Sequence, residues 1–166
     1  MGFDPYVDTA TMRAAGVEKA DNLQAMLAAS DFVSIHCVLN EQTRHMIGKA
    51  ELACLRPSAI LINVSRGALV DEIALVEAIV DGRLAGAGLD VYAVEPLRKS
   101  GHLMSQLFGR DNVILFPHLT FYSAEAMQRL EADVLARCDE ILEGRPVTVR
   151  SRDPRLLAQS TGVTFT

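Results

Sequence analysis

Short apolar runs alternate with stretches of helical periodicity through the middle of this chain. Runs of strand length are found at residues 32–37, 59–64, 87–92 and 112–116. Apolar residues at helical spacing fall between these runs and again after the last of them. Strands that alternate with helices in this way predict an α/β fold built on a parallel sheet.

Proline, glycine and capping residues set the expected helix ends. A short helix within residues 43–55 should end before Pro57, because proline lacks an amide donor and disfavours helix in the residue before it. Asp71 can cap the next helix and Gly82 can end it. The side chains expected along one side of that helix are Ile73, Leu75, Val76 and Ile79. Ser123 should cap a long last helix that ends near Gly144. Its apolar side chains are Met127, Leu130, Val134, Cys138, Ile141 and Leu142.

The flanking segments have less regular patterns. Residues 5–30 are typical of two short helical pieces around Gly16-Val17, the second capped by Asp21. Residues 96–111 are expected to form a long loop, and loops of that length often have a function. The polar segment after Arg150 has no periodicity that predicts an element.

The composition is that of an ordinary globular domain. Of the 166 residues, 49% are hydrophobic and 22% are charged, which excludes wholesale disorder. The net charge is −5 and no block of Lys or Arg stands out, so neither nucleic acid nor an anionic membrane is expected as a partner. The apolar runs are also far shorter than the roughly 20 residues that a membrane-spanning helix needs.

The cysteines and the first residues indicate a cytoplasmic protein. Cys37, Cys54 and Cys138 are odd in number, far apart and without a CxxC pair, so we expect reduced thiols and no metal site. The segment from Met1 to Pro5 lacks the basic and apolar regions of a signal peptide.

Three polar residues come directly after strand-like runs. Arg66 follows the run that ends at Ser65, Glu95 follows the run that ends near Tyr92, and His118 follows Pro117. The carboxyl ends of parallel strands meet at one edge of a sheet, which is where ligands bind. There a guanidinium can hold a carboxylate in a bidentate contact, and an imidazole can carry a proton near neutral pH. A carboxylate beside the imidazole favours its charged form and fixes the ring. The set could therefore reduce a keto acid, provided that a cofactor supplies the hydride.

Each of these residues also has a simpler explanation when it is taken alone. Arg66 could be a surface ion-pair partner, Glu95 a solvated acid before proline, and His118 a loop histidine. Asp90 could cap the end of its strand, and Asp4 could be a turn residue before proline. Among the other histidines, His36 is best explained as a polar strand terminus, and His45 and His102 as exposed side chains.

Three spaced motifs favour the catalytic explanation. They are Leu61-Ile62-Asn63-Val64-Ser65-Arg66-Gly67-Ala68-Leu69-Val70-Asp71-Glu72, Gly86-Ala87-Gly88-Leu89-Asp90-Val91-Tyr92-Ala93-Val94-Glu95-Pro96, and Phe116-Pro117-His118. In this order they resemble the NAD-binding domain of the D-isomer-specific 2-hydroxyacid dehydrogenases, over Gly2 to about Val149. The resemblance implies an incomplete Rossmann-like doubly wound parallel sheet. It also implies that Arg66 binds the substrate carboxylate, that His118 is the acid/base, and that Glu95 pairs with His118.

The same resemblance implies NAD as cofactor. Gly2-Phe3-Asp4 is similar to the end of the second Rossmann strand, where an acidic residue bonds the adenosine ribose and disfavours the phosphate of NADP. Val64, Ser65 and Asp90 are the other positions expected to contact the cofactor. Small 2-oxo and 2-hydroxy acids are the implied substrates, and a homodimer is the implied assembly.

Two parts of such an enzyme have no counterpart in the 166 residues. The Gly-x-Gly-x-x-Gly turn should lie about 20 residues before an acid such as Asp4, and a substrate domain should come before that turn. We therefore expect residues 1–149 to be a partial NAD-binding domain and residues 150–166 to be a tail that leads back toward a substrate domain. The expected function is that of a D-2-hydroxyacid dehydrogenase, present as a C-terminal portion that is inactive alone. An NAD-sensing corepressor-like binding module and a catalytically dead remnant are the alternatives.

Overall fold

The computed structural model describes residues 1–98, 100–149 and 163–165, in two compact units. The first unit is Met1–Thr120 and the second is Phe121–Thr166. The predicted domain boundary at residue 149 remains a prediction, and residues 150–162 and 166 of the expected tail lie outside the described residues.

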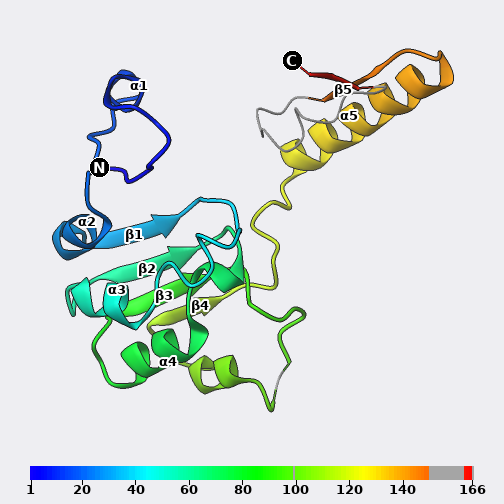
Figure 1. Ribbon diagram of the computed structural model, residues 1–166. Helices are drawn as coiled ribbons and strands as arrows, with labels where there is room; N and C mark the ends of the chain where they lie inside the picture. Colours follow the sequence, from blue (N-terminus) through cyan, green and yellow to red (C-terminus); the bar gives the residue numbers. More distant parts are fainter. Residues whose placement is uncertain (99, 150–162, 166) are drawn as a thin grey trace. The chain divides into compact units, whose positions relative to one another are not determined.

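The first unit is built on a parallel sheet of four strands. They are β1 (Phe32–Ile35), β2 (Ile60–Asn63), β3 (Gly86–Leu89) and β4 (Val113–Leu115). The strands are hydrogen-bonded in chain order, so that Val33 pairs with Leu61 and Leu61 with Ala87 (Figure 1). The predicted Rossmann-like α/β fold is confirmed.

Short helices precede the first of these strands and connect the others. They are α1 (Thr9–Ala14), α2 (Leu23–Ala29), α3 (Lys49–Cys54), the 3₁₀ turn η1 (Gly67–Leu69), α4 (Glu72–Val80) and the 3₁₀ helix η2 (Leu103–Leu107). Neighbours in the row α2, α3, α4 and η2 are in contact with one another. Their apolar side chains form one core with the alternate strand residues Val33, Ile35, Leu61 and Leu89, all of which are buried.

The opposite face of the sheet is open within this unit. Phe32 is 69% exposed and Ile114 is 63% exposed, and Ile60 and Ile62 are only half-buried. A mostly apolar hollow of about 500 Å³ lies along this face. The run at 59–64 is apolar on both sides, which predicts a strand buried on both faces. Within the unit only one side is buried, because the described helices of the unit pack on a single face.

Several element boundaries differ from those predicted. The four strands are shorter than the apolar runs that predict them, and the helix expected within 43–55 begins only at Lys49. Asn22 caps α2 in place of Asp21, since its side chain accepts a hydrogen bond from the amide of Ala25. Of the four residues predicted to line one side of α4, Leu75, Val76 and Ile79 are buried. Ile73 is 61% exposed and does not belong to the buried side. The expected loop at 96–111 contains η2, which His102 caps from a half-buried position.

The second unit contains the long helix α5 (Ala124–Leu142) and two short strands. Ser123 caps α5 as predicted, with its side chain accepting a hydrogen bond from the amide of Ala126. Strands β5 (Val147–Val149) and β6 (Val163–Phe165) pair in parallel. The buried carboxylate of Glu140 accepts hydrogen bonds from the amide and hydroxyl of Thr148, which ties α5 to β5. Among the described residues, no helix is long and apolar enough to cross a bilayer.

Candidate active site

The turn after β2 carries Arg66 to the carboxyl edge of the sheet. The buried side chain of Asn63 accepts a hydrogen bond from the amide of Ser65 and donates one to the carbonyl of Arg66. Gly67 then passes against the neighbouring loop, where a Cβ would lie 1.9 Å from the carbonyl carbon of Tyr92. A side chain at position 67 would therefore separate the Arg66 turn from the loop that follows β3.

The loop after β3 holds the carboxylate of Glu95. One oxygen of Glu95, Oε1, accepts a hydrogen bond of 2.8 Å from the amide of Tyr92. The amide of Ala93 donates to the carboxylate of Glu72, at the first turn of α4, over 2.7 Å. Two successive amides of the loop are thus hydrogen-bonded to carboxylates, and the second oxygen of Glu95 faces the end of the next strand.

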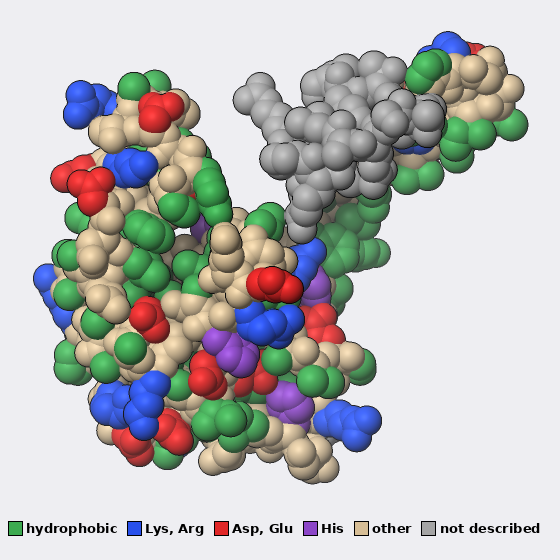
Figure 2. All heavy atoms as spheres, in the orientation of Figure 1, with side chains coloured by type: hydrophobic (Ala, Val, Ile, Leu, Met, Phe, Trp, Pro, Cys, Tyr) green, Lys and Arg blue, Asp and Glu red, His purple; other side chains and the backbone are tan. Residues whose placement is uncertain are grey.

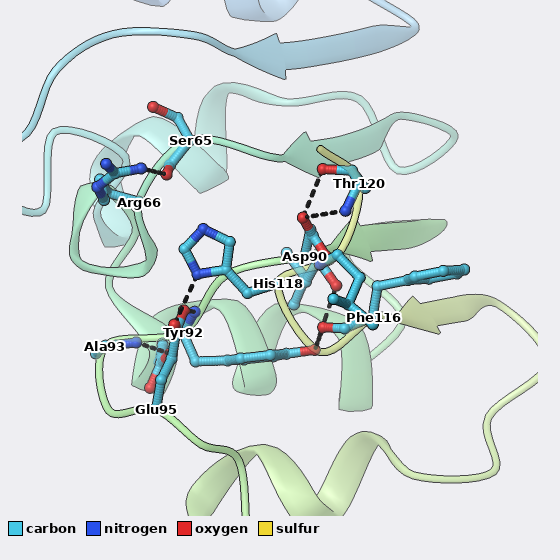
Figure 3. Close-up of polar contacts among 12 residues, drawn as sticks. Ser65, Arg66, Asp90, Tyr92, Ala93, Glu95, Phe116, His118 and Thr120 are labelled. Carbon is cyan, nitrogen blue, oxygen red and sulfur yellow. Dashed lines mark hydrogen bonds and ion pairs between the residues drawn. The ribbon is translucent and has the colours of Figure 1, made fainter. Parts of the chain in front are cut away.

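His118 meets that second oxygen. Its Nδ1 lies 2.8 Å from Oε2 of Glu95 (Figure 3). Because an ionised carboxylate only accepts hydrogen bonds, the proton of this contact belongs to the ring nitrogen. The two side chains are 39% and 34% exposed, so a ligand at the sheet edge can reach the pair.

His118 has an unusual backbone conformation. Its φ is 58°, in the left-handed region that residues other than glycine rarely adopt. The next two residues are hydrogen-bonded to Asp90, a carboxylate that is only 2% exposed. Asp90 therefore fixes the main chain directly after His118.

The carboxylates of Asp90 and Glu95 are both stabilised in their ionised forms. Burial by itself would raise the pKa of Asp90, but hydrogen bonds from Thr120 and Leu119 bring it below the usual value. Burial also opposes ionisation of Glu95, and the contact with His118 together with the Tyr92 amide lowers its pKa overall. The ionised carboxylate of Glu95 is therefore an acceptor for the hydrogen bond from Nδ1 of His118.

Tyr92 connects the two strand ends that carry this pair. Its ring is buried, and its hydroxyl lies 2.8 Å from the carbonyl of Phe116 and 3.2 Å from that of Leu89. Burial raises the pKa of Tyr92 to about 12, so the hydroxyl keeps its proton. The structural roles of Tyr92 and Asn63 were not predicted from the sequence. The available signal was that each has a polar group within an otherwise apolar run.

Replacing Tyr92 with Phe should destabilise the chain. The change leaves the carbonyl of Phe116 without the hydrogen bond from Tyr92, which should lower the free energy of unfolding by about 1 kcal/mol. Urea unfolding monitored by circular dichroism measures the difference. Tyr122→Phe is the matched control, because Tyr122 is 68% exposed. Equal effects of the two substitutions would contradict the structural role given to the Tyr92 hydroxyl.

Arg66 lies at the same edge, without a recorded hydrogen bond to Glu95. Its Nη1 donates to the carbonyl of Ser65 over 2.6 Å, and its side chain is exposed. Figure 3 shows Arg66, Glu95 and His118 around this edge. In the space-filling view, basic, acidic and histidine side chains lie side by side on the surface in the lower half of the picture (Figure 2). The structure thus joins Glu95 to His118 and leaves Arg66 open to a ligand.

The predicted cofactor contacts are more scattered. Oδ1 of Asp4 accepts hydrogen bonds from the amides of Tyr6 and Val7, so this carboxylate is fixed by the turn that follows it. The Ser65 hydroxyl donates to the carbonyl of Cys37 over 2.6 Å. Val64 and Asp90 both line the hollow on the open face of the sheet. Their roles toward a cofactor remain predictions.

A parallel sheet with Glu95 and His118 in contact at its carboxyl edge places the chain among the Rossmann-like domains, which bind ligands at that edge. The model of the D-isomer specific 2-hydroxyacid dehydrogenase NAD binding domain matches residues 1–120. The chain belongs to this family, as its motifs predict.

Curated relatives and solved structures agree with this assignment. The D-3-phosphoglycerate dehydrogenase of Methanocaldococcus jannaschii is 34% identical over 144 residues, which are 87% of this chain and 26% of that protein. The glyoxylate reductase of Thermococcus litoralis is 43% identical over 122 residues, 74% of this chain and 35% of that protein. The D-lactate dehydrogenase of Lactobacillus jensenii, solved with NAD⁺, aligns with a TM-score of 0.76 and 27% identity, over 87% of this chain and 46% of that one. The chain thus spans between 26% and 46% of the length of these relatives.

Proposed function

We propose that this chain supplies the acid/base pair and part of the NAD site of a dehydrogenase that interconverts 2-oxo acids and D-2-hydroxy acids. The observation that carries the proposal is the 2.8 Å contact between His118 and Glu95 at the ligand-binding edge of the sheet. Arg66, exposed at the same edge, supports it. A cytoplasmic location is part of the proposal, supported by the three free cysteines.

The residues present suit the nicotinamide and ribose ends of the cofactor better than its centre. Asp4 is held by its own turn at the position expected to bond the ribose hydroxyls, and the open hollow reaches Asp90. A Gly-x-Gly-x-x-Gly turn, which would hold the pyrophosphate, does not occur in the sequence of 166 residues. When bound, reduced nicotinamide supplies the hydride that adds to the carbonyl carbon of the substrate.

The chain's own residues would do the rest of the chemistry. Arg66 holds the substrate carboxylate through its planar guanidinium and so fixes the neighbouring carbonyl group. His118 gives its Nε2 proton to the carbonyl oxygen as the hydride arrives, and takes a proton from the hydroxyl in the reverse direction. Glu95 keeps the ring oriented by accepting the hydrogen bond from Nδ1.

A chimera tests this proposal. The N-terminal part of the Thermococcus litoralis glyoxylate reductase, up to the region that matches this chain, is joined to residues 1–149. NADH oxidation is followed with glyoxylate, pyruvate and hydroxypyruvate. We expect turnover with at least one of these acids, and a large rise in KM when Arg66 is replaced with Gln. A folded chimera that binds NADH but turns over no 2-oxo acid would instead favour a cofactor-sensing binding module.

Asp4 should give the chimera a preference for NADH over NADPH. A carboxylate that bonds the ribose hydroxyls also repels the 2′-phosphate, so Asp4→Ala should narrow the ratio of the two kcat/KM values by about tenfold or more. Steady-state rates with each cofactor measure the ratio. Asp21→Ala is the control, because Asp21 is exposed and caps no helix. Equal kcat/KM values for NADH and NADPH in the unmodified chimera would contradict the role proposed for Asp4.

The isolated chain should associate with itself, in line with the proposed homodimer. Among the described strands β1 pairs only with β2, and an unpaired edge beside exposed apolar residues is a ready site for pairing. Sedimentation velocity over a range of concentrations should show a dimer that weakens in Phe32→Asn. Tyr6→Asn is the control, since Tyr6 is 82% exposed but lies outside the sheet. A monomer at every concentration, unfolding cooperatively, would mean that the chain closes its own sheet.

A further inference from the structure

Both oxygens of Asp90 contact the two residues that follow His118. Oδ1 accepts a hydrogen bond of 2.8 Å from the amide of Leu119. Oδ2 accepts two hydrogen bonds from Thr120, one of 3.0 Å from its amide and one of 2.5 Å from its hydroxyl. The carboxylate is 2% exposed and comes from the end of β3, so the main chain after His118 is attached to the adjacent strand (Figure 3).

These hydrogen bonds lie next to His118, whose backbone conformation is unfavourable for an L-residue. With φ at 58°, His118 is in the left-handed region, where the Cβ of an L-residue crowds its own backbone. Such a residue stays there only when the surrounding structure holds it. The hydrogen bonds to Asp90 fix the direction of the chain directly after His118, and the left-handed turn is what aims the ring at Glu95.

The Thr120 hydroxyl is the one side-chain donor among the three hydrogen bonds recorded to Asp90 in the described part of the chain. Its contribution is also electrostatic: together with the two amides it lowers the pKa of Asp90 against the effect of burial. An ionised carboxylate accepts stronger hydrogen bonds than a neutral one. The hydroxyl adds a third hydrogen bond between Asp90 and the segment after His118, beside those from the two amides.

We propose that Thr120 is a positioning residue for the acid/base pair, whose hydroxyl acts through Asp90 to hold the left-handed turn at His118 and keep Nδ1 on Glu95. Its importance for catalysis rests on the proposed dehydrogenase function, but the positioning itself does not. Asp90 is then a structural acceptor behind the pair, whether or not it also contacts a cofactor.

Nuclear magnetic resonance on the ¹⁵N-labelled 166-residue chain tests this role without any need for turnover. One readout is the hydrogen-bonded Nδ1 proton of His118, assigned with His118→Gln. The second is the exchange rate of the Leu119 and Thr120 amides. Thr120→Val removes the hydroxyl at nearly constant volume, and Thr120→Ser restores it. Thr11→Val is the matched control, because the Thr11 hydroxyl also donates to an aspartate, Asp8, in a different part of the unit.

In Thr120→Val the His118 proton signal should be lost or broadened, and the two amides should exchange about tenfold faster. Thr120→Ser should restore both readouts, and Thr11→Val should change neither. A His118 signal in Thr120→Val like that of the unsubstituted chain would overturn the proposal, as would a failure of Thr120→Ser to restore it. If Thr120→Val does not fold, Thr120→Ala gives the same comparison. An inactive chimera with the expected spectra would refute the dehydrogenase function and leave the positioning role intact.

Discussion

Replacing His118 with Ala in the chimera should lower kcat by about 10²–10⁴-fold, because positioned general acid–base catalysis contributes on that order. KM for the 2-oxo acid should change much less, since Arg66 rather than His118 is assigned to the carboxylate. Stopped-flow measurement of NADH oxidation at saturating substrate gives the effect on the chemical step.

The control for this substitution is His45→Ala. His45 is the other described residue besides glycine with a positive φ, at 53°, and its side chain is exposed. It therefore reproduces the effect of placing Ala in a left-handed backbone without removing the proposed acid. Equal loss of rate in both variants would show that backbone strain, rather than lost proton transfer, explains the His118 result.

The 166-residue chain alone should turn over 2-oxo acids slower than the chimera by a factor on the order of 10² or more. Its sequence lacks the glycine turn whose amides and helix dipole hold the pyrophosphate. A second domain that closes over substrate and cofactor is not found among the described residues either, and small misplacements at a reacting centre are costly. The absorbance of NADH with pyruvate, glyoxylate or hydroxypyruvate measures the rate.

The outcome that would contradict this expectation is sustained oxidation of NADH by the chain alone that disappears in His118→Ala. Such a result would mean that the chain, as a dimer, rebuilds a working site. Activity that persists in His118→Ala would point to a contaminating enzyme and would leave the expectation standing.

The sheet could be predicted because each strand is a compact apolar run between helix signals. Its ends could not be predicted to the residue, because β-pairing stops where the neighbouring strand stops: Ile35 pairs with Asn63, the last residue of β2. The helix η2 was missed for a different reason. Leu103, Met104 and Leu107 have helical spacing, but Gly101 and Gly109 beside them favour a loop.

The contact between Glu95 and His118 was predictable from the spaced motifs, whereas the hydrogen bonds that support it were not. Glu95 and His118 both follow strand-like runs, so the topology of a parallel sheet brings them together. The contacts of Asp90 join residues 29 and 30 positions apart in the chain. Nothing in the local pattern shows which way the carboxylate of Asp90 turns, so sequence reasoning could offer only strand capping or a cofactor contact.

Selection for heat resistance alone would act against His118, the proposed acid/base residue. An L-residue in the left-handed region costs about 1–2 kcal/mol, a cost that glycine does not share. His118, with its φ of 58°, is such a residue. A library randomised at this position and screened only for heat stability should therefore enrich glycine, together with asparagine. A related domain that no longer carried out proton transfer should also replace this histidine with glycine. Glycine at this position in a relative would therefore indicate that the proposed proton transfer has been lost.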